Sequence, residues 1–184
     1  MTSVTGVDAG QDLLAEVQQQ HRVECFLYEE AELLDNWDWP AWYALFDDSV
    51  RYWMPVRHNR LRRDRGADEV PDGIEMAHFD DDIRSLKLRV DQMASGRHWA
   101  EDPPSRTRHL VSNVRIRPLS SDSSDLAVRS NFLVYRNRLE TEVDVWAGER
   151  RDVLSPTGDS FRIAARTILL DQNVLIAKNL SVFF

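Results

Sequence analysis

The stretch LAVRSNFLVYRN at residues 126–137 alternates apolar and polar side chains, which is typical of a β-strand with one buried face. One face of this strand is predicted to carry Leu126, Val128, Ser130, Phe132 and Val134. LETEVDVWAGERRDVL at residues 139–154 alternates in the same way, with one side carrying Leu139, Thr141, Val143 and Val145. Together the two stretches predict that the second half of the chain forms a sheet.

Turn signals divide the rest of this half into further strands. Clusters of Ser, Asp, Pro and Gly predict turns at residues 120–125 and 155–160, and Gln172-Asn173 predicts a tight hairpin. The strands that these turns separate are predicted at residues 110–117, 161–171 and 174–184.

The first half of the chain predicts helices. Residues 11–35 contain neither Gly nor Pro, and their apolar side chains recur at intervals of three and four, which predicts a long helix with one apolar stripe. Asp38 as an N-cap and Pro40 in the first turn predict a short second helix that ends near Phe46.

A strand and a third helix follow. VRYWMPV at residues 50–56 predicts the strand. Residues 78–96 predict the helix. Asp80–Asp82 would lie at its N-terminus, where the helix dipole favours carboxylates, and the helix would end at Gly96.

Helices near the start of a chain and strands near its end define the α+β class. Residues 1–10 are predicted to be a loose N-terminal tail, and residues 11–184 a single domain. The expected architecture is a curved, mostly antiparallel sheet wrapped around the long N-terminal helix.

Composition excludes several classes of function. The 184 residues include 23 Lys and Arg against 31 Asp and Glu, so the net charge of −8 argues against nucleic-acid binding. No apolar stretch approaches the length of a membrane helix, and the N-terminus lacks the pattern of a secretory signal. A single cysteine, Cys25, gives no disulfide, and we expect a cytoplasmic protein.

The sequence contains no motif for a nucleotide or a metal. No Gly-rich phosphate loop occurs, and none of the five histidines pairs with another at a spacing of four. One cysteine cannot hold an iron–sulfur cluster, because even a Rieske centre needs two Cys and two His. We therefore expect no metal and no cofactor in this chain.

His109 is the one candidate for acid–base chemistry. It begins a strand that is predicted to line the concave face of the sheet, and a partner carboxylate is available at Asp47 or Asp48. A histidine paired with a carboxylate in an apolar cavity suits general acid–base elimination. The alternative is a buried histidine that a carboxylate holds for structural reasons, and this alternative is favoured.

Several arginines and the last two aromatic residues suggest subunit contacts or core packing rather than catalysis. Arg106 and Arg108 lie on the same side of an extended strand and suit a carboxylate partner, in a subunit contact or an internal salt bridge. A loop at 57–75 carries an arginine cluster that either is solvated or grips phosphates or an acidic partner: Arg57, Arg60, Arg62, Arg63 and Arg65. Phe183 and Phe184 are expected in the core or in an interface.

Several long segments of the chain carry a family resemblance. They are FLYEEAELLDNWDWPAWYALFDDSVRYWMPVR (26–57), AHFDDDIRSLKLRV (77–90), WAEDPPSRTRHLVSNV (99–114), VRSNFLVYRNRLE (128–140) and LLDQNVLIAKNLSVFF (169–184), and the segment at 99–114 is the most specific. Together they resemble the small (beta) subunits of Rieske non-heme iron aromatic-ring-hydroxylating dioxygenases, and especially their biphenyl, toluene and alkylbenzene branch. The resemblance covers residues 12–184.

The resemblance implies a fold and a role. The implied fold is a cone similar to nuclear transport factor 2, scytalone dehydratase and ketosteroid isomerase. The implied assembly is a hexamer of three large and three small subunits, in which the large subunit carries the Rieske two-iron two-sulfur cluster and the mononuclear iron. The holoenzyme would add dioxygen to an aromatic ring to give a cis-dihydrodiol, with electrons from NADH through a reductase and a ferredoxin.

The small subunit would then be a non-catalytic scaffold that contacts the large subunit and other copies of itself. The residues expected at these contacts are Trp99, Arg106, Arg108, His109, Arg57, Arg60, Phe183 and Phe184. Two other classes stay open. One is a stand-alone dehydratase or isomerase of the same fold that uses His109 with Asp47 or Asp48. The other is a binding module for an unrelated partner through the arginine loop.

Overall fold

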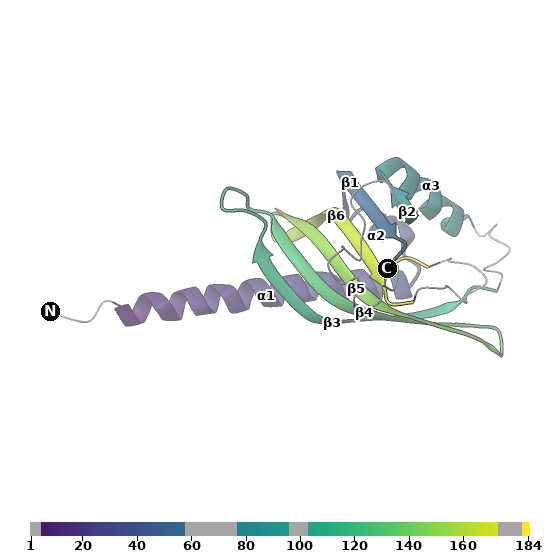
Figure 1. The fold of residues 1–184 in the computed structure, drawn as a ribbon, viewed down its shortest axis with the longest axis horizontal. Coiled ribbons are helices and arrows are strands. Elements are labelled where there is room, and N and C mark those ends of the chain that lie inside the picture. The colour runs from purple at the N-terminus through teal and green to yellow at the C-terminus, as the bar shows by residue number, and fades with distance from the viewer. Residues whose placement is uncertain (1–4, 58–76, 96–102, 173–181) are drawn as a thin grey trace, which may run out of the picture.

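The computed structural model describes residues 5–57, 77–95, 103–172 and 182–184, with the side chains of residues 5–9 left aside. The elements are α1 (Thr5–Asp35), α2 (Trp39–Tyr43), β1 (Phe46–Pro55), β2 (Ala77–Asp81), α3 (Ile83–Ala94), β3 (Arg106–Pro118), β4 (Leu126–Arg138), β5 (Glu142–Thr157) and β6 (Ser160–Leu170). The six described strands form one sheet in the order β2-β1-β6-β5-β4-β3. Strands β1 and β6 pair in parallel, and every other neighbouring pair is antiparallel (Figure 1). The predicted α+β class, with a curved and mostly antiparallel sheet, is confirmed.

The sheet curves around the C-terminal part of α1, and the core lies between them (Figure 1). Apolar side chains of α1 that recur at helical spacing, among them Val23 and Leu27, are fully buried there. They pack with the even-numbered residues of β4, such as Val128 and Val134, because alternate side chains of a strand face the same way. Odd-numbered residues of β4 lie on the outer face of the sheet.

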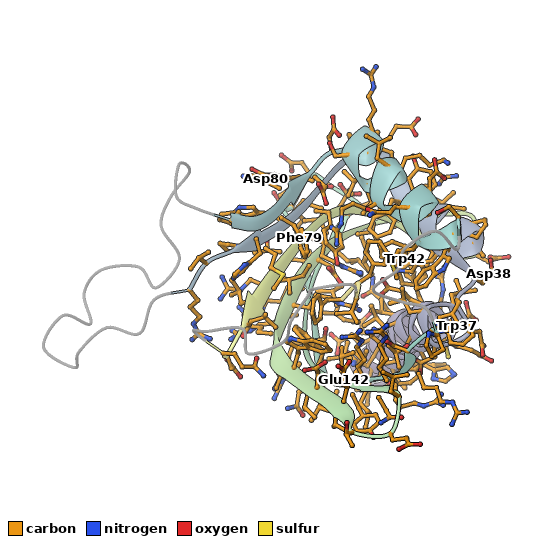
Figure 2. All side chains as sticks on the ribbon, turned by 90° about the vertical axis from the view of Figure 1, so that its right-hand side faces the viewer. Trp37, Asp38, Trp42, Phe79, Asp80 and Glu142 are labelled. Carbon is orange, nitrogen blue, oxygen red and sulfur yellow. The ribbon has the colours of Figure 1, made fainter. Side chains whose placement is uncertain are left out.

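The short helix α2 closes one end of the core. The side chain of Asp38 caps this helix by accepting a hydrogen bond from the main-chain nitrogen of Ala41 at 3.2 Å. Trp42 points into the interior, whereas Asp38 and Trp37 lie at the edge (Figure 2). The helix ends at Tyr43, earlier than predicted.

The prediction of a third helix at residues 78–96 was wrong for its first residues. Residues 77–81 form the edge strand β2, and the helix α3 begins only at Ile83, where the Asp82 side chain accepts a hydrogen bond from Ser85 N at 2.8 Å. The run of three aspartates therefore has two roles. Asp82 caps the helix, while Asp80 and Asp81 in the strand pair with arginines. The helix ends at Ala94, and the predicted stop Gly96 lies outside the described residues.

Other predicted boundaries also shift. Strand β1 begins at Phe46 rather than Val50, and β3 begins at Arg106 rather than Leu110. Most of the predicted last strand at 174–184 lies outside the described residues, and its described end, residues 182–184, is not a strand. Helix α1 begins at Thr5, within the predicted tail, and the division into a tail and one domain stays a prediction.

Candidate functional site: the interior of the curved sheet

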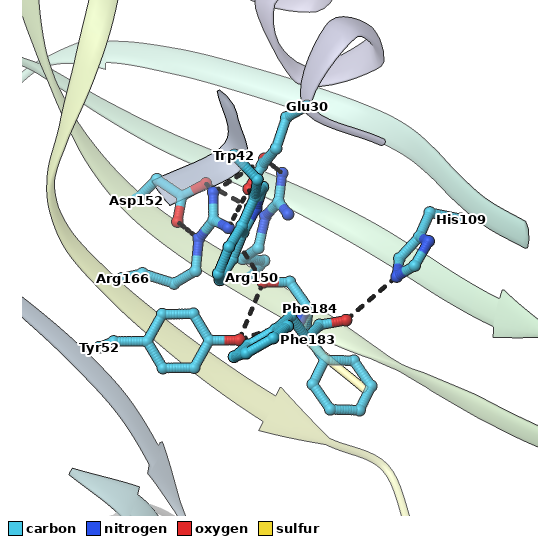
Figure 3. Close-up of polar contacts among 9 residues, drawn as sticks. All are labelled: Glu30, Trp42, Tyr52, His109, Arg150, Asp152, Arg166, Phe183 and Phe184. Carbon is cyan, nitrogen blue, oxygen red and sulfur yellow. Dashed lines mark hydrogen bonds and ion pairs between the residues drawn. The ribbon is translucent and has the colours of Figure 1, made fainter. Parts of the chain in front are cut away.

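A group of four charged side chains lies buried together inside the curved sheet. Glu30 comes from α1, Arg150 and Asp152 come from β5, and Arg166 comes from β6 (Figure 3). Arg150 and Asp152 are two residues apart on one strand, so both face inward, and Asp152 is paired in register with Arg166. Glu30 continues the buried stripe of α1 toward them. Strand alternation and helix periodicity therefore bring all four groups to one point.

Arg166 lies at the centre of this buried ion cluster. Its Nε and Nη2 atoms donate to the two carboxylate oxygens of Asp152 at 2.8 and 3.1 Å, in a bidentate pair. Its Nη2 also donates to Glu30 Oε2 at 3.0 Å, and its Nη1 contacts the other Glu30 oxygen. Two positive and two negative charges thus offset each other away from water.

Arg150 and Trp42 complete the surroundings of the cluster. Arg150 Nη2 lies 3.0 Å from Glu30 Oε2, and Arg150 Nε lies 3.1 Å from Asp152 Oδ2. Both are ion pairs, but the angles do not suit a hydrogen bond. Trp42 Nε1 donates to Glu30 Oε1 at 3.1 Å. Both carboxylates are consequently committed to groups of this chain.

Electrostatics keep the cluster charged. Burial alone would raise the pKa of Glu30, but the arginines at 150 and 166 outweigh burial and lower this pKa to about 2. Burial alone would lower the pKa of Arg166, but Asp152 and Glu30 raise it. Burial raises the pKa of Tyr52, so its hydroxyl stays protonated near neutral pH.

The main chain of Phe184 occupies the polar space beside the cluster. The Tyr52 hydroxyl donates to the Phe184 main-chain oxygen at 3.2 Å and accepts from its nitrogen at 2.9 Å. Arg166 Nη1 donates to the same oxygen at 2.9 Å. The Phe184 ring packs 5.4 Å from that of Phe132 and 6.1 Å from that of Trp146.

Phe183 fills the adjacent apolar space, with its ring 4.4 Å from that of Trp42. The relative exposure of Phe183 and Phe184 is 3% and 1%. Of the two predicted locations, core and interface, the structure places both side chains in the core of this chain.

His109 pairs with a different carboxylate from those predicted. Its Nδ1 lies 2.7 Å from Asp35 Oδ1 and its Nε2 lies 3.0 Å from the main-chain oxygen of Phe183, so both ring nitrogens are occupied (Figure 3 shows the second contact). Asp47 instead accepts hydrogen bonds from Ser49, and Asp48 is exposed. The predicted pairing with Asp47 or Asp48 was wrong, because the end of α1 reaches the start of β3 and places Asp35 there.

The space beside His109 is small. A cavity of about 20 Å³ adjoins it, lined by Trp39, Met93, Thr107 and Phe183 among others. That volume holds about one water molecule, whereas sites for small organic molecules measure roughly 300–1,000 Å³. In the described part of the chain, His109 therefore has neither a free nitrogen nor room for a substrate.

The other predicted site residues do not gather here. Arg108 is exposed and its Nη1 donates to Asp35 Oδ2 at 3.1 Å, while Arg106 is exposed on the same side of β3. Arg57 pairs with Asp171 at 2.8 Å. Trp99, Arg60 and the rest of the arginine cluster, Arg62, Arg63 and Arg65, lie outside the described residues.

Protonation of Glu30 is expected to destabilise the chain in acid. Its folded-state pKa of about 2 lies below the ordinary value of 4.5, so its contribution is complete above about pH 4.5 and is lost as the pH falls toward 2. The loss is about 3 kcal/mol in the free energy of unfolding by pH 2, which urea titrations at pH 6, 4 and 2 measure.

Glu30→Gln should remove most of this pH dependence. Asp80→Asn is the matched control, because it changes an exposed aspartate whose pairing with Arg51 also lowers its pKa, and it should leave the dependence nearly intact. If Glu30→Gln keeps the full acid dependence of the wild type between pH 4.5 and 2, the cluster does not behave as described.

No helix among the described residues has both the length and the apolarity to cross a membrane. Within the same ranges, no three His, Cys, Asp or Glu side chains gather as a metal ion would require.

The fold and the filled interior define a class: an α+β protein whose curved sheet encloses its own ion cluster and aromatic residues. The chain matches the family of ring-hydroxylating beta subunits over residues 29–177, and it belongs to that family.

Two relatives show how close the match is. The benzene 1,2-dioxygenase subunit beta of Pseudomonas putida is 46% identical over 167 residues, which are 90% of this chain and 88% of that protein. The biphenyl 2,3-dioxygenase subunit beta of Rhodococcus jostii is 42% identical over 167 residues, with the same coverage of both chains.

Solved structures confirm the predicted fold. A chain of naphthalene 1,2-dioxygenase with indole bound in its active site has a TM-score of 0.81 at 24% identity, and 100% of each chain is covered. A structure assigned provisionally as a scytalone dehydratase from Novosphingobium aromaticivorans has a TM-score of 0.59 at 14% identity, covering 85% of this chain and 87% of that one.

Proposed function

We propose that this chain is the structural small subunit of a multicomponent aromatic-ring-hydroxylating dioxygenase. It assembles with the large subunit, which carries out the oxidation of an arene such as biphenyl or an alkylbenzene to a cis-dihydrodiol. The observation that carries the proposal is the filled interior. The polar groups that would contact a substrate there belong to Tyr52, Arg166 and His109. They instead form hydrogen bonds with the main-chain oxygens of Phe183 and Phe184. Family membership supports the same role.

The cofactors of this system belong to the partner in our proposal. The donor set of this chain does not fit a Rieske two-iron two-sulfur cluster, because the sequence holds only one cysteine and the cluster needs two. We assign the cluster and the mononuclear iron to the large subunit, in a hexamer of three large and three small subunits in the cytoplasm. NADH would supply electrons through a separate reductase and ferredoxin.

A stand-alone dehydratase or isomerase that uses His109 is the competing function. It predicts turnover by the purified chain and its loss in His109→Ala. Our proposal expects no turnover by this chain alone, since both nitrogens of His109 are already bonded. Turnover of a dehydratase or isomerase substrate that His109→Ala abolishes would favour the competing function.

Arg106 and Arg108 are expected to support assembly. Both are exposed on one side of β3. Arg108 donates to Asp35 of this chain through Nη1 only, and its side chain is 71% exposed, so both guanidinium groups can still meet carboxylates of a neighbouring subunit. Arg106→Ala combined with Arg108→Ala should weaken assembly with the large subunit at least tenfold, as measured by the mass of the co-expressed complex in light scattering.

The control replaces two exposed residues on α3, Arg84→Ala with Lys87→Ala, and should leave assembly unchanged. Full assembly of the Arg106 and Arg108 double variant would show that these residues are not at the contact.

A further inference from the structure

The N-terminal part of α1 projects beyond the sheet and has no support from the described residues of this chain. Figure 1 shows it extending away from the strands, and every residue from Gly10 to Gln19 is exposed. Gln20 is where the helix meets the sheet, because its Nε2 donates to the main-chain oxygen of Val114 at 3.2 Å. The overhang, residues 5–19, is about 20 Å long at the rise of an α-helix.

This overhang carries large apolar side chains in water. Leu13, Leu14 and Val17 are 61%, 58% and 56% exposed, and their spacing of three and four places them on one side of the helix. A helix of this length is marginal in water by itself, and an apolar stripe of this kind marks a contact with another molecule.

The overhang is also acidic. Asp12 and Glu16 lie one turn apart beside the apolar stripe, and residues 1–21 contain no lysine or arginine. A partner surface that suits this helix must be basic and must also offer apolar contacts.

The outer face of the sheet offers such a surface. A hollow of about 540 Å³ lies over β3, β4, β5 and β6. Its basic side chains are Arg115, Arg117, Arg129 and Arg151, and between them lie the small side chains of Ala127, Val153, Ala165 and Thr167.

The hollow has a net positive charge although the whole chain has a charge of −8, because the one acidic residue in its lining, Asp152, is paired with the buried Arg166. Arg129 and Arg151 share one carboxylate, that of Glu149. Arg115 and Arg117 are exposed, and no carboxylate within the described ranges pairs with either of them.

The same outer face carries further exposed apolar side chains across β3, β4 and β5. Leu110 is paired in register with Leu133, and Tyr135 with Val145, so these side chains are neighbours on the sheet. An exposed apolar patch of this kind on a sheet favours coverage by another molecule.

The overhang cannot reach the hollow of its own chain, because α1 packs on the inner face of the sheet and the hollow is on the outer face. We propose that the overhang of one copy binds in the arginine hollow of a second copy, with Asp12 and Glu16 facing the arginines and the apolar stripe against the small side chains. The contact joins two different surfaces, so copies are linked head to tail. The inference rests on the proposed function, which already requires several copies of this chain.

Charge reversal on each side tests this contact. Arg115→Glu with Arg117→Glu changes the hollow, and Asp12→Lys with Glu16→Lys changes the overhang. All four residues are exposed, so the fold should be retained. Light scattering of the purified chain should show each double variant dissociating toward single copies, with self-association weakened at least tenfold.

The combination of all four reversals should restore self-association to within about threefold of the wild type, because opposite charges again face each other. Arg84→Glu with Lys87→Glu on α3 is the matched control and should self-associate as the wild type does. Unchanged self-association in either double variant, or no restoration in the combined variant, would overturn the inference.

Co-expression with the large subunit separates this inference from the proposed function. If the reversals release the large subunit while self-association is unchanged, the overhang binds the large subunit instead, and the inference is wrong although the proposed function holds. If self-association follows the charges but no large subunit ever binds, the proposed function fails and the inference stands.

Discussion

Replacing Arg166 with alanine is expected to destabilise the chain by about 3–5 kcal/mol, because the change leaves the carboxylates of Glu30 and Asp152 buried with too little positive charge. It also removes a donor to the main-chain oxygen of Phe184. Urea unfolding at neutral pH measures the effect as a lower midpoint.

Arg51→Ala is the matched control, because Arg51 forms an ion pair of 2.7 Å with Asp80 at the surface. An exposed pair contributes about 0–1 kcal/mol, so this variant should unfold nearly as the wild type does. Arg166→Lys keeps the charge and loses the bidentate geometry, so its stability should lie between those of the wild type and Arg166→Ala. Equal effects of Arg166→Ala and Arg51→Ala would contradict the account of the cluster.

Replacing Phe184 with alanine is expected to cost about 3–5 kcal/mol as well, which is the range for a fully buried aromatic side chain. The change removes the ring contacts with Phe132 and Trp146 and leaves a cavity next to the ion cluster. Thermal unfolding should show a midpoint lower by roughly 6–20 °C.

Leu88→Ala provides the comparison, because Leu88 on α3 is 72% exposed and its truncation should change stability by no more than about 0.5 kcal/mol. We also expect Phe184→Ala to reduce the amount of large subunit recovered with the chain, since the scaffold itself is weakened. A fully stable Phe184→Ala variant would mean that this residue does not hold the interior together.

Periodicity predicted the framework of the fold. The alternation of residues 126–137 correctly gave one buried face on β4, and the apolar stripe of residues 11–35 correctly gave the long helix. The predicted stripe contained Asp35 but not Glu30, and it also contained Leu13, Leu14 and Val17, which are exposed. The buried face of the helix instead carries Val23, Phe26, Leu27, Glu30 and Leu34, so the signal was Glu30, a carboxylate at a core-facing helical position. The signal was not used because a charged residue is ordinarily read as exposed.

Tertiary contacts decided what periodicity could not. On β5 the alternation shows two faces, but the apolar residues Val143 and Val145 lie on the exposed face, whereas Arg150 and Asp152 lie on the buried one. Burial of these charges depends on Arg166 and Glu30, which are distant in sequence. The edge strand β2 was missed for a similar reason, since Asp80 is held in the sheet by pairing with β1.

Purification of a tagged copy of this chain from its own cells, followed by a visible absorption spectrum and iron analysis of the eluate, tests the central claim most directly. The account predicts a reddish-brown eluate that contains a larger partner and iron, with this chain as a scaffold. A colourless eluate that contains this chain alone would contradict it.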